Sequence, residues 1–244
     1  MSEKPPPSAA TFDAPGYFDE SVAARYDQGI RLSCPSYDAL HLSLAPLLHN
    51  LPDRSRFLCA GAGTGAEILT LGARFPSWQF LAVDVSADML AVCQRRAAQA
   101  GLAHRLECFH GRMEDYAGTV APPLLFDGAS SVFVSHFIDG RERKLAYLRA
   151  IAAALRPGAP FVLADLYGDP ASPEFPVLFQ AWLRYYVSHG ISEEKLRQDL
   201  DHILRNISFT PEQELHALLH EAGFTRVLRF HQAFLFGGWI ATRA

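Results

Sequence analysis

Three glycines within five residues are the first feature of this sequence whose spacing could do chemistry. Gly61, Gly63 and Gly65 follow the apolar run FLCA and precede a segment with the apolar spacing of a helix. Glycines let the backbone turn sharply and approach a ligand, and the first turn of a helix offers N–H groups without intrahelical partners. We therefore predict that Gly61, Ala62 and Gly63 contact a bound cofactor. The alternative is a glycine turn that binds nothing, because such turns also serve as plain connections.

A single carboxylate, Asp84, ends the next apolar run, QFLAVD. It follows the glycines by about 20 residues, the spacing at which an acid binds the ribose hydroxyls of a nucleotide cofactor. Asp84 could instead cap the helix that begins near Ala87, but Ser86 is able to make that cap. We predict that Asp84 and its neighbour Val85 bind a nucleoside cofactor. The loop and the acid together do not separate S-adenosylmethionine (SAM) from NAD.

Two polar residues that follow later apolar runs, His136 and Asp165, are suited to moving a proton. His136 comes just after ASSVFVS, and Asp165 ends PFVLAD. Imidazole titrates near neutral pH, and positioned His and Asp side chains are common general acids and bases. Each also has a structural explanation, because a histidine here can pack or cap and an aspartate can accept a backbone hydrogen bond. We predict that these two residues are catalytic.

The elements that must position these residues are short apolar runs alternating with amphipathic segments. The runs are FLCA, QFLAVD, RLECFH, ASSVFV and PFVLADLY. Strands that alternate with helices predict a parallel sheet with helices on both faces, and ligands bind at the carboxyl ends of such strands. The last two runs, FTRVLRFH and AFLFGGWIAT, are joined too tightly for a parallel crossover and predict an antiparallel hairpin. The expected fold is therefore α/β and Rossmann-like, with seven mostly parallel strands and a C-terminal antiparallel hairpin.

The length of 244 residues is enough for one large core. The triple proline at positions 5–7 predicts a disordered tail over residues 1–16, followed by a single domain over residues 17–244. Helices at 17–26 and 37–48 predict an N-terminal helical lid over residues 17–50. A helical insertion is expected over residues 172–207, where Trp182, Tyr185 and Tyr186 either roof an acceptor pocket or form one helix face docked on the core.

Composition narrows the class of partners. The net charge is -4 and there is no run of Lys or Arg, so nucleic acid is not expected as a partner. No stretch is apolar enough to span a membrane, and no secretory signal precedes the domain, which predicts a cytoplasmic location. The four cysteines lack C-x-x-C pairing and the histidines lack a ligand spacing, so no metal site is expected. A homodimer is compatible with the extra helices.

Three features favour SAM over NAD as the cofactor. A long segment precedes the first strand, the last two strands form the hairpin, and the loop after the fourth strand lacks a hydride-transfer signature. We therefore predict a SAM-dependent methyltransferase that acts on a small-molecule acceptor and releases S-adenosyl-L-homocysteine. Methyl transfer requires the acceptor atom to be held in line with the methyl group, and a base when that atom carries a proton. Oxygen, nitrogen and carbon acceptors all stay open.

From about Phe18 onward the chain resembles the class I SAM-dependent methyltransferases, and within them the carboxy-S-adenosylmethionine synthase family of the tRNA wobble-uridine pathway. The resemblance rests on FDESVAARYD, SCPSY, the glycine loop, LAVDVSADML, LRPG followed by FVLAD, and EAGFTRVLRFHQAFLFGGWIATRA. It implies that Tyr37 reaches over the cofactor and that Arg112 and Met113 lie at its adenine end. Met113 could equally be ordinary core filling, because methionine suits irregular gaps.

The chain departs from that family at positions where the family binds its ligand. The acid at the end of the first strand corresponds to Cys59, and the acid that accepts from the adenine amine corresponds to Arg112. Each loss is expected to weaken binding by about 1 to 3 kcal/mol unless Glu67, Glu114 or Asp115 compensates.

Two further departures lie on the fourth strand and in the expected helical insertion. Val132 replaces an asparagine, and Leu200 replaces the arginine that binds the family's extra carboxylate, leaving Arg197 one helical turn away. Because leucine cannot replace the two-pronged contact of an arginine, we favour an ordinary methyl donor. The alternatives are a carboxy-SAM synthase-like enzyme, a non-catalytic nucleoside-binding protein and, more distantly, an NAD-dependent enzyme.

Overall fold

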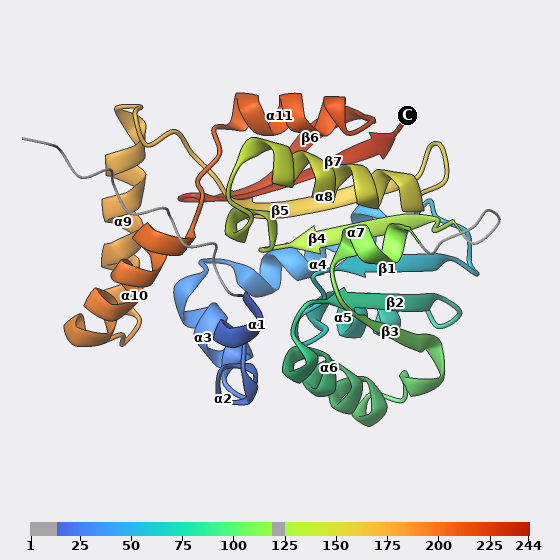
Figure 1. Ribbon diagram of the computed structural model, residues 1–244. Helices are drawn as coiled ribbons and strands as arrows, with labels where there is room; N and C mark the ends of the chain where they lie inside the picture. Colours follow the sequence, from blue (N-terminus) through green and yellow to red (C-terminus); the bar gives the residue numbers. More distant parts are fainter. Residues whose placement is uncertain (1–13, 119–124) are drawn as a thin grey trace, which may run out of the picture.

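The computed structural model describes residues 14–118 and 125–244 and contains a seven-stranded sheet of order β3-β2-β1-β4-β5-β7-β6. Neighbouring strands from β3 to β5 pair in parallel, whereas β7 pairs antiparallel with both β5 and β6. The predicted fold class is therefore confirmed (Figure 1). The strands are β1 (Arg56–Ala60), β2 (Gln79–Asp84), β3 (Leu106–His110), β4 (Gly128–Val132), β5 (Pro160–Leu166), β6 (Phe224–Ala233) and β7 (Phe236–Arg243).

Helices cover both faces of this sheet (Figure 1). Strand side chains alternate between the faces, so Leu58 of β1 packs with one helical layer while Phe57 packs with the other. Both side chains are fully buried, which stabilises the fold by about 1.5 to 3 kcal/mol each. The first layer holds α7 (Met113–Ala117), α8 (Arg141–Ala154) and α11 (Glu212–Glu221), and the second holds α4 (Tyr37–Leu47), α5 (Ala66–Arg74) and α6 (Ala87–Gln99).

Two further groups of helices lie beside each other at one end of the sheet, at the left and lower centre of Figure 1. The N-terminal group is α1 (Ala14–Tyr17), α2 (Glu20–Ala23) and α3 (Tyr26–Ser33), and the other is α9 (Glu174–Ser188) and α10 (Glu193–Asn206). The indole N–H of Trp182 on α9 donates a 2.8 Å hydrogen bond to the Ser33 carbonyl at the end of α3. The two groups therefore form one helical end wall.

The sequence prediction of one helix over residues 17–26 was wrong. Asp19 interrupts it with extended backbone, and its carboxylate accepts from the Val22 amide to cap α2. The predicted tail lies outside the described residues except for positions 14–16, which begin α1. Both α9 and α10 fall inside the predicted insertion.

Two strand boundaries also differ from expectation, each because of a residue in the left-handed region. Phe133 has φ of 60° and ends β4 two residues early, and Phe234 has φ of 51° in the turn before β7. Such conformations are costly for residues other than glycine and interrupt the regular pairing of a strand.

Arg105, in the short helix η1 (Ala103–Arg105), provides a test of how the second layer is held. Its buried guanidinium donates to the carbonyls of Gly72, Phe75 and Trp78, which closes the C-terminal end of α5. We expect Arg105→Met to lower the free energy of unfolding by about 3 kcal/mol, because it leaves these carbonyls without their donor. Urea unfolding measures the change.

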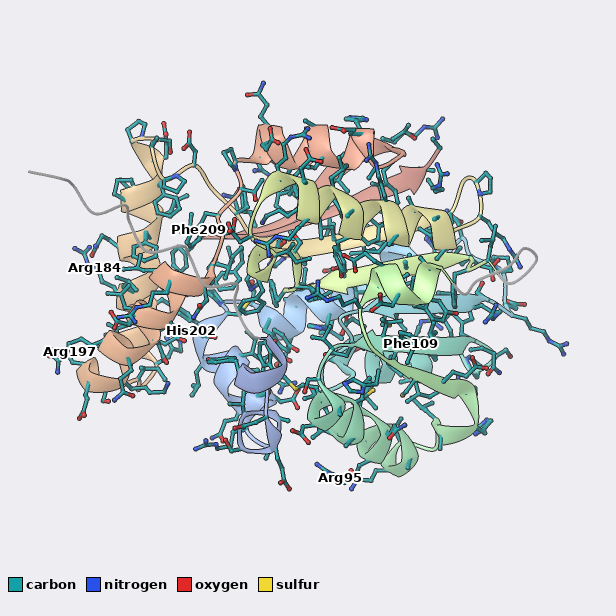
Figure 2. The ribbon with its side chains drawn as sticks, in the orientation of Figure 1. Arg95, Phe109, Arg184, Arg197, His202 and Phe209 are labelled. Carbon is teal, nitrogen blue, oxygen red and sulfur yellow. The ribbon has the colours of Figure 1, made fainter. Side chains whose placement is uncertain are left out.

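The control is Arg95→Met, since Arg95 is exposed on α6 and points away from the sheet (Figure 2). We expect this change to stay within about 0.5 kcal/mol. Equal effects of the two substitutions would contradict a structural role for the Arg105 hydrogen bonds.

Candidate active site

A cavity of about 270 Å³, termed here the cofactor cavity, opens at the carboxyl ends of β1, β2 and β4. This is the edge at which the sheet topology places ligands. Most of the predicted cofactor-binding residues meet there. Those on its wall are Gly61, Gly63, Asp84, Val85, Arg112 and Met113.

The glycine loop between β1 and α5 leaves space that a side chain would take. Gly61 and Gly63 have φ of 72° and 52°. A Cβ on Gly61 would lie 2.2 Å from Val134, whereas a Cβ on Gly63 would project into open space. Glycine is therefore required at position 61 because a side chain there would clash with Val134. At position 63 it is required for the positive φ, and it leaves the space above the loop open. Ala62 differs from both, since its side chain is buried with the second helical layer and is absent from the cavity wall.

Asp84 links the loop to the second strand. Its carboxylate accepts the Gly63 amide at 2.8 Å and the Ser86 amide at 2.9 Å. Burial raises the pKa of Asp84, and these backbone hydrogen bonds oppose that shift. The helix cap belongs to Ser86, whose hydroxyl accepts from the Met89 amide, as predicted. A carboxylate can accept about four hydrogen bonds, so Asp84 retains capacity for ribose hydroxyls.

The far end of the cofactor cavity fits a flat apolar ring with a polar edge. Met113 is 3% exposed and belongs both to this wall and to the core. Arg112 is exposed at the start of α7, and Glu114 on the same helix also lines the cavity. Glu114 thus supplies a carboxylate near the position where the related family has an acid in place of Arg112. Asp115 is exposed and is not on the described wall.

Where the related family has an acid at the end of the first strand, this chain has Cys59. A different carboxyl group, that of Glu67, lies nearby. Glu67, in the first turn of α5, is buried and accepts from the Ser130 hydroxyl at 3.5 Å. Its other oxygen lies 3.9 Å from His41 Nε2, which has no hydrogen-bond partner among the described residues. Burial raises the pKa of Glu67 to about 7, and that carboxyl in turn contributes to the raised pKa of the Cys59 thiol, after burial itself. This chain therefore has a carboxyl group in the helix that follows the glycine loop and a thiol at the end of the first strand.

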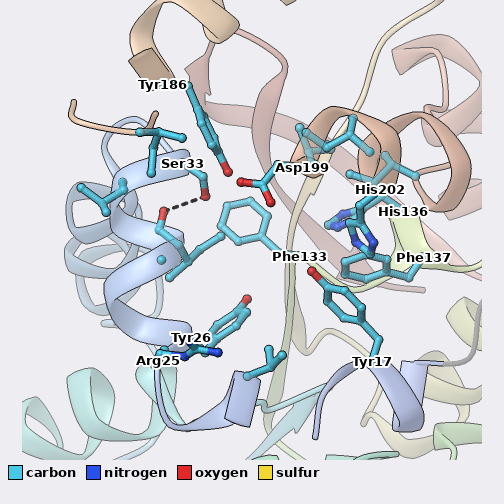
Figure 3. A pocket seen from close by; sticks show the side chains of 18 of the residues that line it. Tyr17, Arg25, Tyr26, Ser33, Phe133, His136, Phe137, Tyr186, Asp199 and His202 are labelled. Atoms are coloured by element: carbon cyan, nitrogen blue, oxygen red, sulfur yellow. Dashed lines mark hydrogen bonds between the residues drawn. The ribbon is translucent and has the colours of Figure 1, made fainter. Parts of the chain in front are cut away.

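A second cavity of about 440 Å³, termed here the acceptor cavity, lies between the helical end wall and the ends of β4 and β5 (Figure 3). It shares Phe18, Tyr26, Phe133 and Phe137 with the cofactor cavity, so the two spaces adjoin through aromatic side chains. Trp182 and Tyr186 of α9 are buried on its wall, in accord with both explanations weighed for these aromatics.

His136, in the short helix η2 (Ser135–Phe137), is held by Asp165 at the edge of the acceptor cavity. Its Nδ1 and its backbone N–H both contact one Asp165 oxygen, and the Ser135 hydroxyl donates to the other. The Leu166 amide adds a fourth donor at 3.1 Å. His136 is 3% exposed and lines the cavity, which leaves Nε2 as the ring nitrogen not used by the carboxylate. The structure thus brings the two predicted catalytic residues into direct contact.

The charge on Asp165 is stabilised despite complete burial. Burial by itself would raise its pKa, but the His136 and Lys144 charges and the Ser135 hydroxyl outweigh it, so the pKa of Asp165 is lowered. Lys144 is also buried, and its ammonium donates to the carbonyls of Ser135 and Ser208 at 3.0 Å each. This cation therefore joins the catalytic turn to the chain that returns from α10.

Sequence reasoning missed several residues of the acceptor cavity. Tyr26, at the start of α3, lines both cavities. Tyr37, by contrast, is 5% exposed and packs with His41 and Phe133, and it lines neither cavity. Sequence spacing gave no signal for α3. His202 on α10 also lines the acceptor cavity, although its segment, EEKLRQDLDH, reads as a solvated helix face.

The proposed substitute for the family's arginine does not face this cavity. Arg197 is exposed and points outward from α10, whereas His202 lies on the inner side (Figure 2). The cations on the described cavity wall are Arg25 and Lys195. Lys195 forms an ion pair with Asp199, and Arg25 Nε donates to the Ser21 carbonyl at 3.1 Å.

The described residues contain no group of three or more His, Cys, Asp or Glu side chains placed to hold a metal ion. No helix in residues 14–118 and 125–244 combines the length and apolar character needed to cross a membrane.

The buried carboxyl of Glu67 predicts a pH dependence of stability. Its pKa is about 7 when folded against an ordinary 4.5, so the folded protein holds a proton that the unfolded chain has lost between these values. Stability therefore falls as pH rises from about 4.5 to about 7, by roughly 3 kcal/mol, and stays lower above that window. We expect Glu67→Gln to remove most of this loss in urea unfolding between pH 5 and pH 8.

Glu107→Gln is the matched control, because Glu107 is exposed on β3. Its pH profile should follow that of the unmodified protein. An unchanged profile in Glu67→Gln would show that the buried carboxyl does not control stability in this range.

Comparisons with known proteins show that this chain is similar to a methyltransferase family and to a carboxy-S-adenosyl-L-methionine synthase. Residues 57–158 match the family described as "Methyltransferase domain". The chain is 27% identical over 229 residues to a carboxy-S-adenosyl-L-methionine synthase of Chromohalobacter salexigens, an alignment that covers 92% of this chain and 82% of that protein.

Solved structures agree in fold at low sequence identity. An O-methyltransferase family protein from Burkholderia thailandensis has a TM-score of 0.67 at 15% identity, covering 96% of this chain and 64% of its own. Mitomycin 7-O-methyltransferase has a TM-score of 0.58 at 19% identity, covering 92% of this chain and 60% of its own. The chain thus spans less than two thirds of these solved chains. Residues 57–158 are thus similar to a methyltransferase domain, the chain shares the fold of these solved methyltransferases, and SAM is the cofactor that the domain match implies.

Proposed function

We propose that this protein transfers a methyl group from SAM to a small-molecule acceptor that binds in the acceptor cavity. The observation that carries the proposal is the contact between His136 and Asp165 at a cavity that adjoins the cofactor cavity. A base oriented by a carboxylate, next to the donor site, is the arrangement that proton-coupled methyl transfer requires.

The residues of the cofactor cavity are suited to the ribose and adenine parts of SAM. Asp84 would accept from the ribose hydroxyls, Met113 would pack on the adenine ring, and Glu114 would accept from its amine. The opening above Gly63 gives the amino-acid portion room against the loop. When bound, SAM supplies an electrophilic methyl group.

The chain's own contribution to the reaction is positioning and proton removal. In the neutral form of His136, the ring proton would lie on Nδ1, where the Asp165 carboxylate accepts it, so Nε2 is the nitrogen that would accept a proton on the cavity side. His136 Nε2 would take the proton from the acceptor atom, and the lowered pKa of Asp165 means that its charge stabilises the resulting imidazolium. The aromatic wall excludes water, which strengthens this electrostatic stabilisation.

A small molecule is favoured over a macromolecule by the shape and charge of the acceptor cavity. Its volume of about 440 Å³ lies within the range for drug-sized ligands, and aromatic side chains dominate its wall. The net charge of -4 disfavours binding to a phosphate backbone. The same class is supported by the likeness in fold to a mitomycin 7-O-methyltransferase.

A carboxy-SAM synthase-like activity is the second candidate, and the sequence relatives favour it. That reaction would need a cation for the extra carboxylate. Leu200 cannot supply it, Arg197 points outward, and Lys195 is already paired with Asp199. The other cation on the described cavity wall, Arg25, already donates through Nε to the Ser21 carbonyl. We therefore favour methyl transfer.

Asp84 provides the test of cofactor binding. Asp84→Asn replaces a charged acceptor by an amide that can accept only through one oxygen, so we expect SAM to bind about 10 to 100 times more weakly. Isothermal titration calorimetry measures the affinity. Asp88→Asn, an exposed change in the first turn of α6, is the control and should bind as the unmodified protein does. Equal affinities for the two variants would exclude Asp84 from the site.

The reaction itself can be followed with SAM labelled in its methyl group and added to a bacterial extract. We expect label in the small-molecule fraction and at least a hundredfold lower rate in Asp165→Asn, with S-adenosyl-L-homocysteine affinity retained, because the amide no longer stabilises an imidazolium. Asp201→Asn, an exposed change on α10 that lies on the described wall of neither cavity, is the control. Label in RNA, or a co-purified ligand whose mass includes an extra carboxyl group, would contradict the proposal.

A further inference from the structure

The N-terminal helices are attached to the cofactor site at two points that the proposed reaction does not use. The Ser86 hydroxyl, at the start of α6, donates to the Phe18 carbonyl at 2.6 Å. On α3, the Asp27 carboxylate contacts both the glycine loop and α6. Phe18 and Tyr26 line the cofactor cavity, so each attachment lies at or next to a residue of its wall.

The contacts of Asp27 form a closed network of three residues. One carboxylate oxygen accepts from the Thr64 hydroxyl at 3.0 Å, and the other accepts from Arg96 at 2.7 Å. The same Arg96 nitrogen also donates to the Thr64 carbonyl at 3.0 Å. Hydrogen bonds to charged groups are stronger than neutral ones, and here every pair of the three residues is joined directly. Each residue therefore restrains the position of the other two.

Thr64 brings this network into the glycine loop. It lies between Gly63 and Gly65 and is 2% exposed, so packing as well as hydrogen bonding holds it. Gly65 approaches α6 so closely that a Cβ there would lie 2.6 Å from Cys93 Sγ. The loop is thus held against α6, and Asp27 attaches α3 to the same place.

Asp27 acts at one remove from the ligand sites. It is on the described wall of neither cavity, whereas its neighbour Tyr26 lines both (Figure 3). Helix α3 begins at Tyr26, so the position of the helix start determines where this ring lies. A displacement of α3 from the loop would therefore change the width of the cofactor cavity and the wall of the acceptor cavity together.

Resting on SAM as the ligand of the cofactor cavity, we propose that Asp27 is a positioning residue for the donor: by bonding Thr64 and Arg96, it fixes the Tyr26 ring relative to the glycine loop. Gly61 and Gly63 of the loop and the Tyr26 ring are parts of one cavity wall. A site held in its binding geometry before the ligand arrives pays less ordering entropy, so the network raises affinity without touching the ligand. Because Tyr26 also lines the acceptor cavity, the same network aligns the two cavities.

Isothermal titration calorimetry with SAM and with S-adenosyl-L-homocysteine tests this role. We expect Asp27→Ala to bind both ligands about tenfold more weakly, an effect within the range for residues that act on a site without contacting its ligand. Thr64→Val removes only the hydroxyl from which Asp27 accepts and keeps the side-chain shape. We expect it to weaken binding about threefold.

The matched control is Asp38→Asn, because Asp38 also pairs with an arginine and is also attached to α3. Its partner is Arg31 at 2.9 Å, and this exposed pair joins α3 to α4 and not to the glycine loop. The control should bind SAM as the unmodified protein does. Thermal unfolding of each variant identifies any loss of folding, and Thr64→Val keeps the test decisive if Asp27→Ala does not fold.

Double-mutant cycles separate positioning from a general loss of stability. We expect Asp27→Ala and Thr64→Val to be non-additive, because each removes the hydrogen bond that joins the two side chains. In a Tyr26→Leu background, Asp27→Ala should weaken SAM binding by no more than about threefold, because the ring that Asp27 positions is absent. A role limited to stability would leave the effects on SAM affinity additive or absent.

Unchanged SAM affinity in a folded Asp27→Ala variant, an equal loss in Asp38→Asn, or full additivity in both cycles would overturn this role. If the role fails while SAM still binds with the expected dependence on Asp84, the proposed methyl transfer stands. Absence of SAM binding by the unmodified protein would remove both.

Discussion

The buried Asp165 carboxylate is the constraint around which the η2 turn and the carboxyl end of β5 are arranged. A charge with no exposure to water is costly unless it is paired and fully hydrogen-bonded. Here four donors from Ser135, His136 and Leu166 meet it, and the Lys144 cation lies nearby. The hydrogen bonds to this one carboxylate together fix the conformation of the η2 turn, the tautomer of His136 and the position of the end of β5.

Lys144 extends that constraint to the helical insertion. Its ammonium bonds to Ser135 beside the catalytic turn and to Ser208 in the segment that returns from α10, and the Ser208 amide donates to the His136 carbonyl at 2.8 Å. The insertion is therefore anchored to the catalytic turn itself. This anchor explains why the acceptor cavity, built largely from α3, α9 and α10, keeps a fixed relation to the sheet.

The regular part of the molecule was predictable from sequence, because each strand of the sheet is a short apolar run whose residues alternate between two buried layers. The cofactor loop and Asp84 were equally accessible, since their chemistry depends on residues close together in the chain. The acceptor cavity could not be predicted from the sequence. Tyr26 begins a helix that local spacing did not indicate, and His202 sits in a charged amphipathic segment whose inner face only tertiary packing reveals. Tyr37, inferred from resemblance, is packed in the core instead of on a cavity wall.

The exchange of acids around the glycine loop shows how the related cofactor site can persist with different residues. Cys59 is fully buried in β1, where an ionised acid would need a partner, and the carboxyl of Glu67 lies beside it from the next helix. A raised pKa means that Glu67 is close to neutral when no cation is near, and an ammonium group approaching it would favour its charged form. Because the strand has no acid, the carboxyl group beside Cys59 is that of Glu67. The ionisation of Glu67 then depends on the charge of the group that the loop binds. Our proposal therefore assigns the amino-acid end of the donor to the loop backbone and the cavity shape, because Glu67 is not on the described wall of the cofactor cavity.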